Sequence, residues 1–300
     1  MRTLTLVAAC LAVATFVVAP VAQAEDEAVF QKMIKDKAAT VVSVKFVLNI
    51  KITQGGNPVM PPREQAGNAS GIIVDSSGLI MLPGGAFGAG GIPRQFRNRF
   101  EISAVPSNIR VMFPGDTREY DAVLGAKDSK LGLAFVMVKD LAEKKLTALD
   151  MNTAAEPKLG QTLFGVTRLD QGFDHAPMAM RAIVAGSVTK PRTMWIVQGA
   201  GNHIGKPLYN EAGALTGIVV SQEGVGEDSV MRPFLLPLGV AKPTVATALK
   251  KSKAELDRIL EEEEEAAAEA AEAAAEEKKA DEKDAPKKDA PKDDGKKDGE

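Results

Sequence analysis

Cysteine and histidine are scarce in this 300-residue chain. It has one cysteine, Cys10, and two histidines, and Cys10 lies in an apolar stretch near the start. Without that stretch the chain can form no disulfide, so its stability must come from burial of a core. The same scarcity excludes cysteine nucleophiles and cysteine-ligated zinc or iron–sulfur centres from the remaining chain.

A strong charge of one sign is also absent. The chain has 37 basic and 40 acidic residues, and this balance does not indicate a nucleic-acid partner. Its 45% hydrophobic and 26% charged residues are ordinary for a globular protein, which excludes collagen, wholesale disorder and a multi-span membrane protein. Residues 261–300 have a net charge of −9 and the rest of the chain +6, so a mildly basic body carries an acidic tail.

Residues 1–24 have the pattern of a secretory signal. A short basic start, Met1-Arg2-Thr3, precedes an apolar run, and Ala22-Gln23-Ala24 is a small-residue cleavage site. An uncleaved anchor is the alternative, but Pro20 and the acidic residues after the cleavage site argue against it. We therefore expect an exported protein with no membrane span after cleavage. Export without disulfides is typical of the periplasm or cell envelope of a bacterium, with secretion as the alternative.

The C-terminal part is low in complexity. Residues 246–279 are predicted to form a helix rich in Ala, Glu and Lys, which are good helix formers. Between Glu261 and Lys279 no apolar residue is larger than alanine, so the helix has no coiled-coil seam and is expected to be solvated. Residues 280–300 repeat Lys, Asp and Pro and are predicted to be a disordered tail.

The body, residues 25–245, has the pattern of an all-β protein. Short apolar runs are broken by Gly, Pro and Asp, and about six of them fall on each side of a linker near residues 146–159. Asp75-Ser76-Ser77-Gly78 is a good hairpin turn between two such runs. The predicted fold is two six-stranded Greek-key β-barrels, with a single large sandwich as the alternative. Helix is predicted only near 27–37 and after Lys242.

Several segments resemble, in order, motifs of trypsin-like serine proteases of the HtrA/Deg type. The series extends from about Val41 to Leu249, and its clearest members are Gly71–Ile80, Gly115–Leu124, Ala126–Val136, Gly160–Gly165, Ala182–Gly186, Gly201–Leu208, Ala214–Val219 and Phe234–Leu238. The resemblance implies the trypsin-like double barrel with a cleft between its halves. The PDZ domain that usually follows in that family is replaced here by the charged helix and tail.

The resemblance also locates the catalytic triad, and there the match fails. Serine-protease chemistry needs a nucleophilic hydroxyl, an imidazole base and an orienting carboxylate. In the ungapped alignment the base falls on Gly85, the acid on Gly132, and the serine on His203 or, with a different gap, on Ile204. None of these residues supplies the required group. No catalytic residue is therefore predicted, and the turn around His203 is one residue longer than the family's oxyanion turn.

A relocated site has few residues to use. A new triad would need His175 or His203 as its base, and the turn around His203 contains no hydroxyl residue. A serine–lysine dyad would pair Lys206 with Ser70 or Ser221, but we expect the two serines to be ordinary turn and strand residues. Lys206 is expected to point to solvent and His203 to be a partly exposed loop residue.

No cofactor or metal is expected. Asp174 with the two histidines makes a poor ligand set, because adjacent residues rarely reach one ion and a third histidine is absent. No glycine-rich loop stands between a strand and a helix, which argues against a nucleotide site. Trp195 and Phe234 are predicted core residues, and the three arginines near residue 97 are predicted to lie in a solvated loop: Arg94, Arg97 and Arg99.

The sequence thus predicts a catalytically inactive protease homologue of the cell envelope. A cleft without a nucleophile can still bind an extended peptide by strand addition, so a peptide or protein is the expected ligand, with no nucleic acid. Two alternatives stay open: an active serine endopeptidase with a rearranged site, and a structural envelope protein that acts through its charged tail. The sequence leaves the oligomeric state open.

Overall fold

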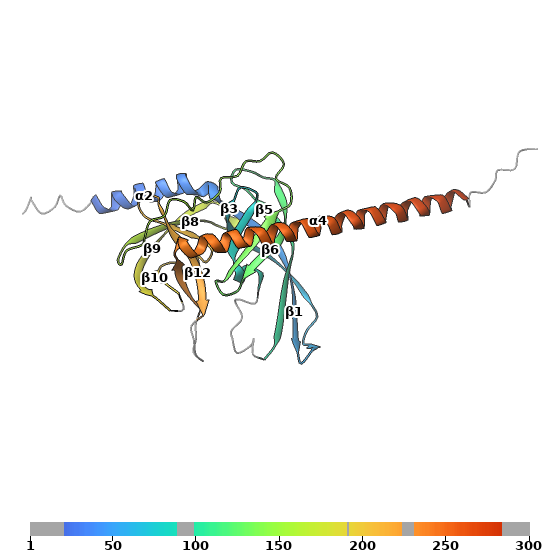
Figure 1. Ribbon diagram of the computed structural model, residues 1–300, viewed down its shortest axis with the longest axis horizontal. Coiled ribbons are helices and arrows are strands. Elements are labelled where there is room, and N and C mark those ends of the chain that lie inside the picture. The colour runs from blue at the N-terminus through green and yellow to red at the C-terminus, as the bar shows by residue number, and fades with distance from the viewer. Residues whose placement is uncertain (1–20, 89–98, 191, 224–230, 284–300) are drawn as a thin grey trace, which may run out of the picture. The chain divides into compact units, whose positions relative to one another are not determined.

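The computed structural model describes residues 21–88, 99–190, 192–223 and 231–283 (Figure 1). By its internal contacts the chain divides into two units, residues 1–256 and 257–300. All of the strands belong to the first unit. The long helix α4 (Leu238–Lys283) belongs to the first unit up to Leu256 and to the second beyond it.

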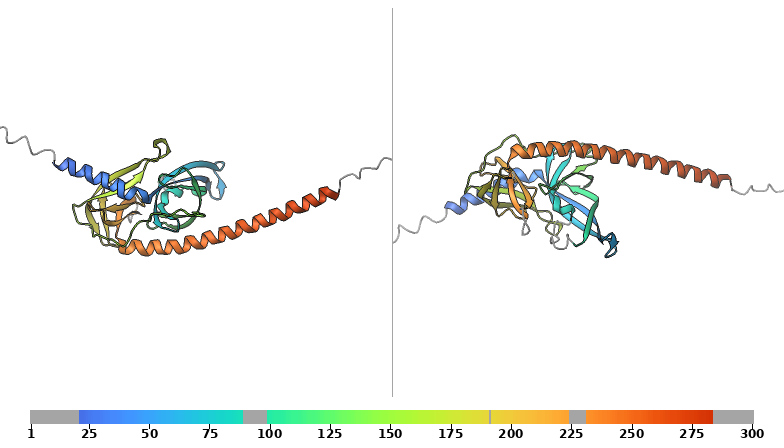
Figure 2. Two further views of the ribbon diagram at one scale, coloured as in Figure 1. Left: turned by 90° about the horizontal axis from the view of Figure 1, so that it is seen from above. Right: turned by 60° about the horizontal axis from the view of Figure 1, so that its bottom comes forward.

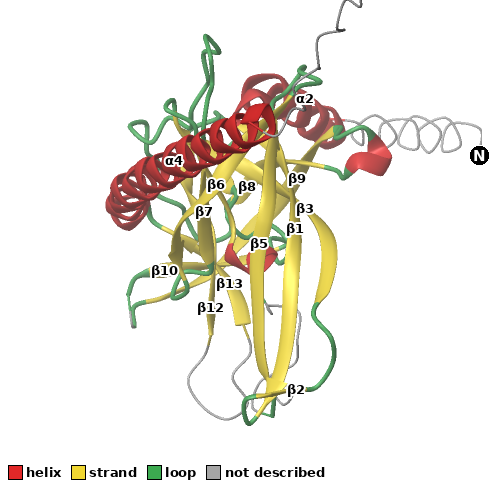
Figure 3. Cartoon of the chain, turned by 90° about the vertical axis from the view of Figure 1, so that its right-hand side faces the viewer, coloured by secondary structure: helices red, strands yellow, loops and turns green. Residues whose placement is uncertain are grey.

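Strands β1 to β7 form an antiparallel sheet that closes into a barrel. Their order is β2-β1-β3-β4-β7-β6-β5, and pairing of β1 with β5 closes the ring of six, to which β2 adds two residues (Figure 3). The strands are β1 (Val41–Gln54), β2 (Asn57–Pro58), β3 (Arg63–Asp75), β4 (Leu79–Pro83), β5 (Glu101–Met112), β6 (Glu119–Asp128) and β7 (Leu133–Val138).

Alternation along β1 separates the core of this barrel from its outer surface. Val42, Val44 and Phe46 belong to the core cluster. Since successive side chains of a strand point to opposite faces, Ser43 and Lys45 point outward. Ser43 is nevertheless only 3% exposed, because residues of the second barrel cover it. The outer face of β1 is therefore part of the contact between the barrels.

Strands β8 to β13 form the second closed barrel, in the order β10-β13-β12-β11-β8-β9. Its core includes Leu163, Val184, Val197, Leu208 and Val219. The strands are β8 (Thr162–Arg168), β9 (Pro177–Val188), β10 (Met194–Gln198), β11 (Pro207–Tyr209), β12 (Leu215–Glu223) and β13 (Met231–Leu236).

The predicted fold class, two six-stranded antiparallel barrels, is confirmed by this topology. Individual strands differ from the prediction where the apolar pattern is weak. The strand predicted from Ile109 is β5 and begins at Glu101, because residues 101–108 alternate half-buried and exposed side chains along β1. The three-residue β11 was not predicted, since it is short and begins with a proline.

Helix α2 (Val21–Lys37) and the short η1 (Ala38–Thr40) precede the first barrel; α2 contacts β8 and β9 of the second barrel, and η1 contacts β3 of the first. Met33 is fully buried, and the Phe30 ring meets the Phe164 ring edge-on with centroids 5.6 Å apart. Lys37 Nζ lies 4.6 Å from the centre of the Tyr209 ring. The described helix overlaps the end of the predicted signal, whose first twenty residues lie outside the described part of the chain.

The first half of α4 packs on the barrels. Ala241, Val245, Ala248, Ser252 and Leu256 are buried at helical spacing, which explains why the helix begins at Leu238, before the predicted residue 246.

The buried serine of this helix fixes the contact with the first barrel. The backbone N–H of Ala126 on β6 donates to Ser252 Oγ at 3.1 Å. A Cβ at the neighbouring Gly125 would lie 2.1 Å from that oxygen, so only glycine allows the contact. The helix thus connects the end of β13 in the second barrel to β6 in the first (Figure 2).

The second unit contains the remainder of α4, from Asp257 to Lys283. Residues 261–272 are exposed, and Arg258 donates a hydrogen bond to Glu262 one turn further on. No helix in the described parts of the chain is both long and apolar enough to cross a membrane. Most of the predicted tail, residues 284–300, lies outside the described residues.

Candidate functional site

The three positions that align with a catalytic triad lie on three connecting segments. Gly85 is in the short helix η2 (Gly84–Phe87), directly after β4. Gly132 is in the turn between β6 and β7, and His203 is in the turn between β10 and β11. The first two segments belong to the first barrel and the third to the second barrel.

Backbone contacts hold the first two segments together. Gly84 N donates to Gly132 O at 2.7 Å. Gly132 has a left-handed φ of +64°, and a Cβ there would lie 3.0 Å from Ser221 Cβ on β12. Ser221 N in turn donates to Leu131 O at 3.1 Å. The segments of Gly85 and Gly132 therefore meet each other and the edge of the second barrel.

The turn of His203 packs against the same region. It is tied to the second barrel by a 2.7 Å hydrogen bond from Gly205 N to Val219 O. Gly205 has a φ of +77°, and a Cβ there would lie 3.0 Å from the backbone carbon of Leu82 and 3.1 Å from the nitrogen of Pro83. The structure thus brings all three triad-equivalent segments to one place between the barrels.

The side chains at this place, where the resemblance puts the substrate cleft, do not supply triad chemistry. Gly85 and Gly132 have no functional group, and a Cβ at Gly85 would meet nothing within 4 Å. His203 is partly buried, and its Nδ1 is buried without a hydrogen-bond partner among the described residues. Burial and the nearby charge of Lys206 lower the pKa of His203, which favours the neutral ring.

The expectation that Lys206 points to solvent is wrong. Its side chain is 3% exposed, and Nζ donates a hydrogen bond to the backbone carbonyl oxygen of Ser70 on β3. Burial lowers the pKa of Lys206 to about 7. The lysine lies between Gly205, which packs against the backbone of Leu82 and Pro83, and the buried Pro207, and its stem enters the contact between the barrels. Lys206 therefore contacts the backbone carbonyl of Ser70 and not its hydroxyl group.

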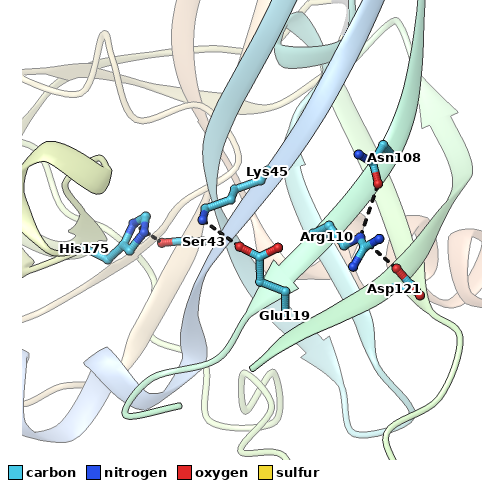
Figure 4. Close-up of polar contacts among 7 residues, drawn as sticks. All are labelled: Ser43, Lys45, Asn108, Arg110, Glu119, Asp121 and His175. Atoms are coloured by element: carbon cyan, nitrogen blue, oxygen red, sulfur yellow. Dashed lines mark hydrogen bonds and ion pairs between the residues drawn. The ribbon is translucent and has the colours of Figure 1, made fainter. Parts of the chain in front are cut away.

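A hydroxyl and an imidazole meet elsewhere between the barrels. Ser43 Oγ on β1 lies 3.0 Å from His175 Nδ1, although the two residues are 132 positions apart in sequence (Figure 4). His175 follows the short helix η3 (Gln171–Phe173), in the loop between β8 and β9. The sequence identified His175 as one of two available bases but gave no sign of Ser43, which lies inside an apolar strand.

Arg168, at the end of β8, holds this region together. Its guanidinium donates to three backbone carbonyls: Val41 O at 2.7 Å, His175 O at 2.8 Å and Ala38 O at 3.1 Å. The backbone N–H of Arg168 donates to Ser70 Oγ at 3.3 Å. One residue therefore links the second barrel to η1, β1 and β3 and fixes the loop that carries His175.

A cavity of about 390 Å³ opens beside the Ser43–His175 pair. Its walls come from the end of β5, the turn that follows it and the loop of His175; they are Ser43, Met112, Phe113, Pro114, Gly115, Asp116, Thr117, Arg168, Asp174 and His175. Asp116 is engaged on the far side, where it accepts from Lys144 Nζ at 2.6 Å and Tyr120 Oη at 2.9 Å. The hydrogen bond from Lys144 is the main reason why the pKa of Asp116 falls to about 2.

Two ion pairs lie to one side of Ser43 and His175 (Figure 4). Lys45 Nζ lies 2.7 Å from Glu119 Oε1, and Arg110 Nε lies 2.8 Å from Asp121 Oδ1. Arg110 Nε also donates to Asn108 Oδ1 at 3.2 Å. These side chains are partly exposed, and pairs of this kind contribute little to stability.

The other residues singled out in the sequence lie neither at the three triad-equivalent positions nor at the Ser43–His175 pair. Trp195 packs against the core of the second barrel and Phe234 is half-buried. Arg94 and Arg97 lie outside the described residues, and Arg99 stacks near Phe100. His175 and His203 join no group of three metal-ligating side chains in the described parts of the chain.

No family model matches this chain, and no curated protein matches it. Among solved structures, it is similar to the protease domain of MamO from Magnetospirillum magneticum in its apo form. The identity is 20%, the TM-score is 0.40, and the match covers 69% of this chain and 95% of that domain. The trypsin-like fold of this chain is established by its own topology: two closed, six-stranded antiparallel barrels joined in sequence.

Proposed function

We propose that this protein is a relative of HtrA/Deg-type proteases that has no peptidase activity and binds an extended peptide or a protein segment in the cell envelope. One observation carries the proposal: the segments equivalent to the triad converge between the barrels, yet two of the three positions are glycine and the third is a histidine whose Nδ1 has no partner in the described residues. Peptide hydrolysis at this place would need a nucleophile, a base and an orienting acid.

Lys206 supports the same proposal. Its buried amine is bonded to the Ser70 carbonyl, so it contacts no hydroxyl that it could activate. The adjacent Gly205 is pressed against the backbone of Leu82 and Pro83. The turn therefore packs as a structural contact between the barrels. We expect such packing where an oxyanion hole is no longer needed.

A free strand edge supports peptide binding. β3 pairs with β1 from Arg63 to Ile72, but with β4 only from Ile72 onward. Within the described residues, the stretch from Arg63 to Ser70 has no strand along its second edge. Such an edge presents backbone donors and acceptors on which an extended peptide can add as a further strand. It ends where Lys206 meets the Ser70 carbonyl, next to the cleft.

Export to the bacterial envelope is part of the proposal and rests on the signal pattern of residues 1–24. In this proposal the charged helix and the acidic tail act as a solvated spacer. Fractionation of cells that express the full chain tests the location, and a protein left in the cytoplasm at its full mass would contradict export.

Peptide binding without cleavage is tested on the purified protein with a library of extended peptides. We expect mass spectrometry to find no cleavage products and photo-crosslinking to map bound peptides to residues 63–70. Strand addition uses alternate backbone groups, so N-methylation of one alternate set of peptide residues should abolish binding and methylation of the other set should not. Cleavage that disappears in the His203→Ala variant would overturn the proposal.

A further inference from the structure

The pair formed by Ser43 and His175 has the first contact that nucleophilic catalysis needs. A serine hydroxyl is weak on its own and is activated by a base within hydrogen-bond distance. Ser43 Oγ and His175 Nδ1 are 3.0 Å apart and come from different barrels. Ser43 is buried in the contact between the barrels, where water competes little for its hydroxyl.

The backbone holds His175 in position. Asp174 and His175 both have left-handed backbone conformations, with φ of 52° and 51°. Consecutive residues of this kind, neither of them glycine, persist only where their surroundings fix them. His175 N donates to Asp170 O at 3.2 Å, and Arg168 donates to His175 O at 2.8 Å. The ring therefore meets Ser43 from a fixed loop.

The second ring nitrogen defines the tautomer that the chemistry needs. His175 Nε2 is buried and has no hydrogen-bond partner in the described residues. With the proton on Nε2, Nδ1 offers its lone pair to the hydroxyl of Ser43 and can act as a base. No described carboxylate is bonded to Nε2, so the loop and the contact with Ser43 orient the imidazole.

Arg168 supplies the group that an oxyanion would need. A guanidinium has five N–H donors, and three of those of Arg168 are used by backbone carbonyls. Two remain, and Arg168 lines the same cavity as Ser43 and His175. Donors placed where negative charge develops are often the largest single contribution to acyl transfer. Nucleophile, base and cation therefore meet at one cavity.

We propose that Ser43 and His175 form an acyl-transfer dyad for small activated carboxylic esters. Ser43 Oγ bonds to the ester carbonyl carbon while its proton moves to His175 Nδ1. The bond from that carbon to the leaving oxygen then breaks, and His175 returns the proton to the leaving alcohol. Water, activated by the same nitrogen, hydrolyses the acyl-serine and restores Ser43.

The cavity sets the size of the substrate. Its volume of about 390 Å³ accepts a short acyl chain or a small aromatic ester, and Ser43 lies too deep for a polypeptide backbone to reach. Its lining residues include none of the triad-equivalent positions. The inference thus goes beyond the proposed peptide-binding function and does not depend on it.

The test uses p-nitrophenyl acetate and the purified protein. We expect a burst of p-nitrophenol with acetylation of a single residue, mapped by peptide mass to Ser43. Ser43→Ala should abolish the burst, and His175→Gln should slow acetylation about 100-fold or more, which is the ordinary contribution of a general base. Ser103→Ala is the matched control, because Ser103 is an exposed serine on β5 that lies outside the cavity and should react like the parent.

A second variant tests activation without relying on turnover. Ser43→Cys places one thiol in a chain whose other cysteine, Cys10, lies in the predicted signal. We expect iodoacetamide to alkylate this thiol at least about 10-fold faster than it alkylates the thiol of the Ser43→Cys/His175→Gln double variant at neutral pH, since the histidine promotes the thiolate. Thermal unfolding of each variant checks that it is folded.

Several results would overturn the inference. They are acetylation that is unchanged in Ser43→Ala, acetylation spread over lysines, no acetylation at all, or equal alkylation rates in the two cysteine variants. None of these results bears on peptide binding. Conversely, cleavage of the peptide library would overturn the proposed function and leave the ester chemistry of Ser43 intact, so the two failures are distinguishable.

Discussion

The place where the resemblance puts the substrate cleft, at Gly85, Gly132 and His203, is held together by main-chain contacts and carries two glycines and a histidine. The Ser43–His175 cavity has a hydroxyl bonded to an imidazole. Both lie where the two barrels meet, and both depend on contacts between residues far apart in sequence. The two places differ in what holds them together. Main-chain packing holds the cleft, and a contact between side chains holds the cavity.

The comparison shows how main-chain packing holds a place in the fold whatever side chains that place carries. In the cleft, left-handed glycines and close backbone contacts connect the barrels, so Gly132 and Gly205 are held by packing whether or not catalysis occurs there. A side chain such as a triad histidine carries no such constraint. Fold and function therefore separate at single positions, and the function must be argued from each site.

Gly205→Ala should have the largest effect on the cleft. The new Cβ would lie 3.0 Å from the Leu82 backbone, and the φ of +77° is unfavourable for alanine. We expect a loss of roughly 3 to 4 kcal/mol in the free energy of unfolding, measured by urea denaturation. Gly201→Ala is the control, because its Cβ would meet nothing within 4 Å. Equal stability of the two variants would contradict the described packing of the turn.

Lys206→Met should change how stability depends on pH. Burial lowers the pKa of Lys206 to about 7 from 10.5, so between these values the unfolded chain holds a proton that the folded chain lacks. Below pH 7 the folded state bears the full free-energy cost of burying the charged amine, and this cost falls as the pH rises. The free energy of unfolding of the parent should therefore rise relative to that of the methionine variant by up to about 1.4 kcal/mol per pH unit, or about 2 to 3 kcal/mol between pH 7 and 9.

Urea unfolding of both proteins at pH 7, 8 and 9 measures this difference, since all other titrating groups cancel between them. The methionine variant leaves the Ser70 carbonyl without its donor, which shifts its stability equally at each pH. Parallel pH profiles would show that the amine of Lys206 keeps its ordinary pKa and lies in water.

Restoring the triad acid should destabilise the protein without restoring activity. Gly132→Asp puts a side chain on a backbone with φ of +64° and a Cβ 3.0 Å from Ser221, and we expect a loss of about 1 to 2 kcal/mol. Gly85→His enters open space and should change stability by less than about 0.5 kcal/mol. The triple variant with Ile204→Ser should hydrolyse peptide substrates no faster than the parent. Measurable hydrolysis would mean that the cleft had lost only its side chains.

The barrels were predictable from the sequence because their strands carry a local signal. Alternation in Val41–Gln54 and the Asp75–Gly78 turn are visible within a few residues, and the order of the family motifs singled out three segments that the structure brings together. The prediction missed β11 and shortened β3 and β5. The missing parts are defined by their pairing with neighbouring strands and not by their own residues.

The chemistry between the barrels was not predictable in the same way. Lys206 is buried and donates to Ser70, which is 136 positions away in sequence, and no apolar run around Lys206 predicts its burial. Ser43 and His175 are separated by 132 positions and by a barrel boundary. Their meeting depends on how the loop after η3 is held by Arg168, and no local pattern encodes that contact.

The ion pair beside the proposed dyad should give the smallest effect, and this result distinguishes a structural contact from a catalytic one. Lys45 and Glu119 lie on the same outer face as Ser43 and form a 2.7 Å ion pair, with side chains 25% and 37% exposed. A double-mutant cycle with Lys45→Met and Glu119→Gln should give a coupling of about 0.2 to 1 kcal/mol, because water screens the pair. Neither variant should change the rate of acetylation at Ser43 by more than about twofold, whereas His175→Gln should change it about 100-fold. A large effect of the ion pair on that rate would mean that the charge of the surrounding surface, and not the contact between Ser43 and His175, sets the reactivity of the cavity.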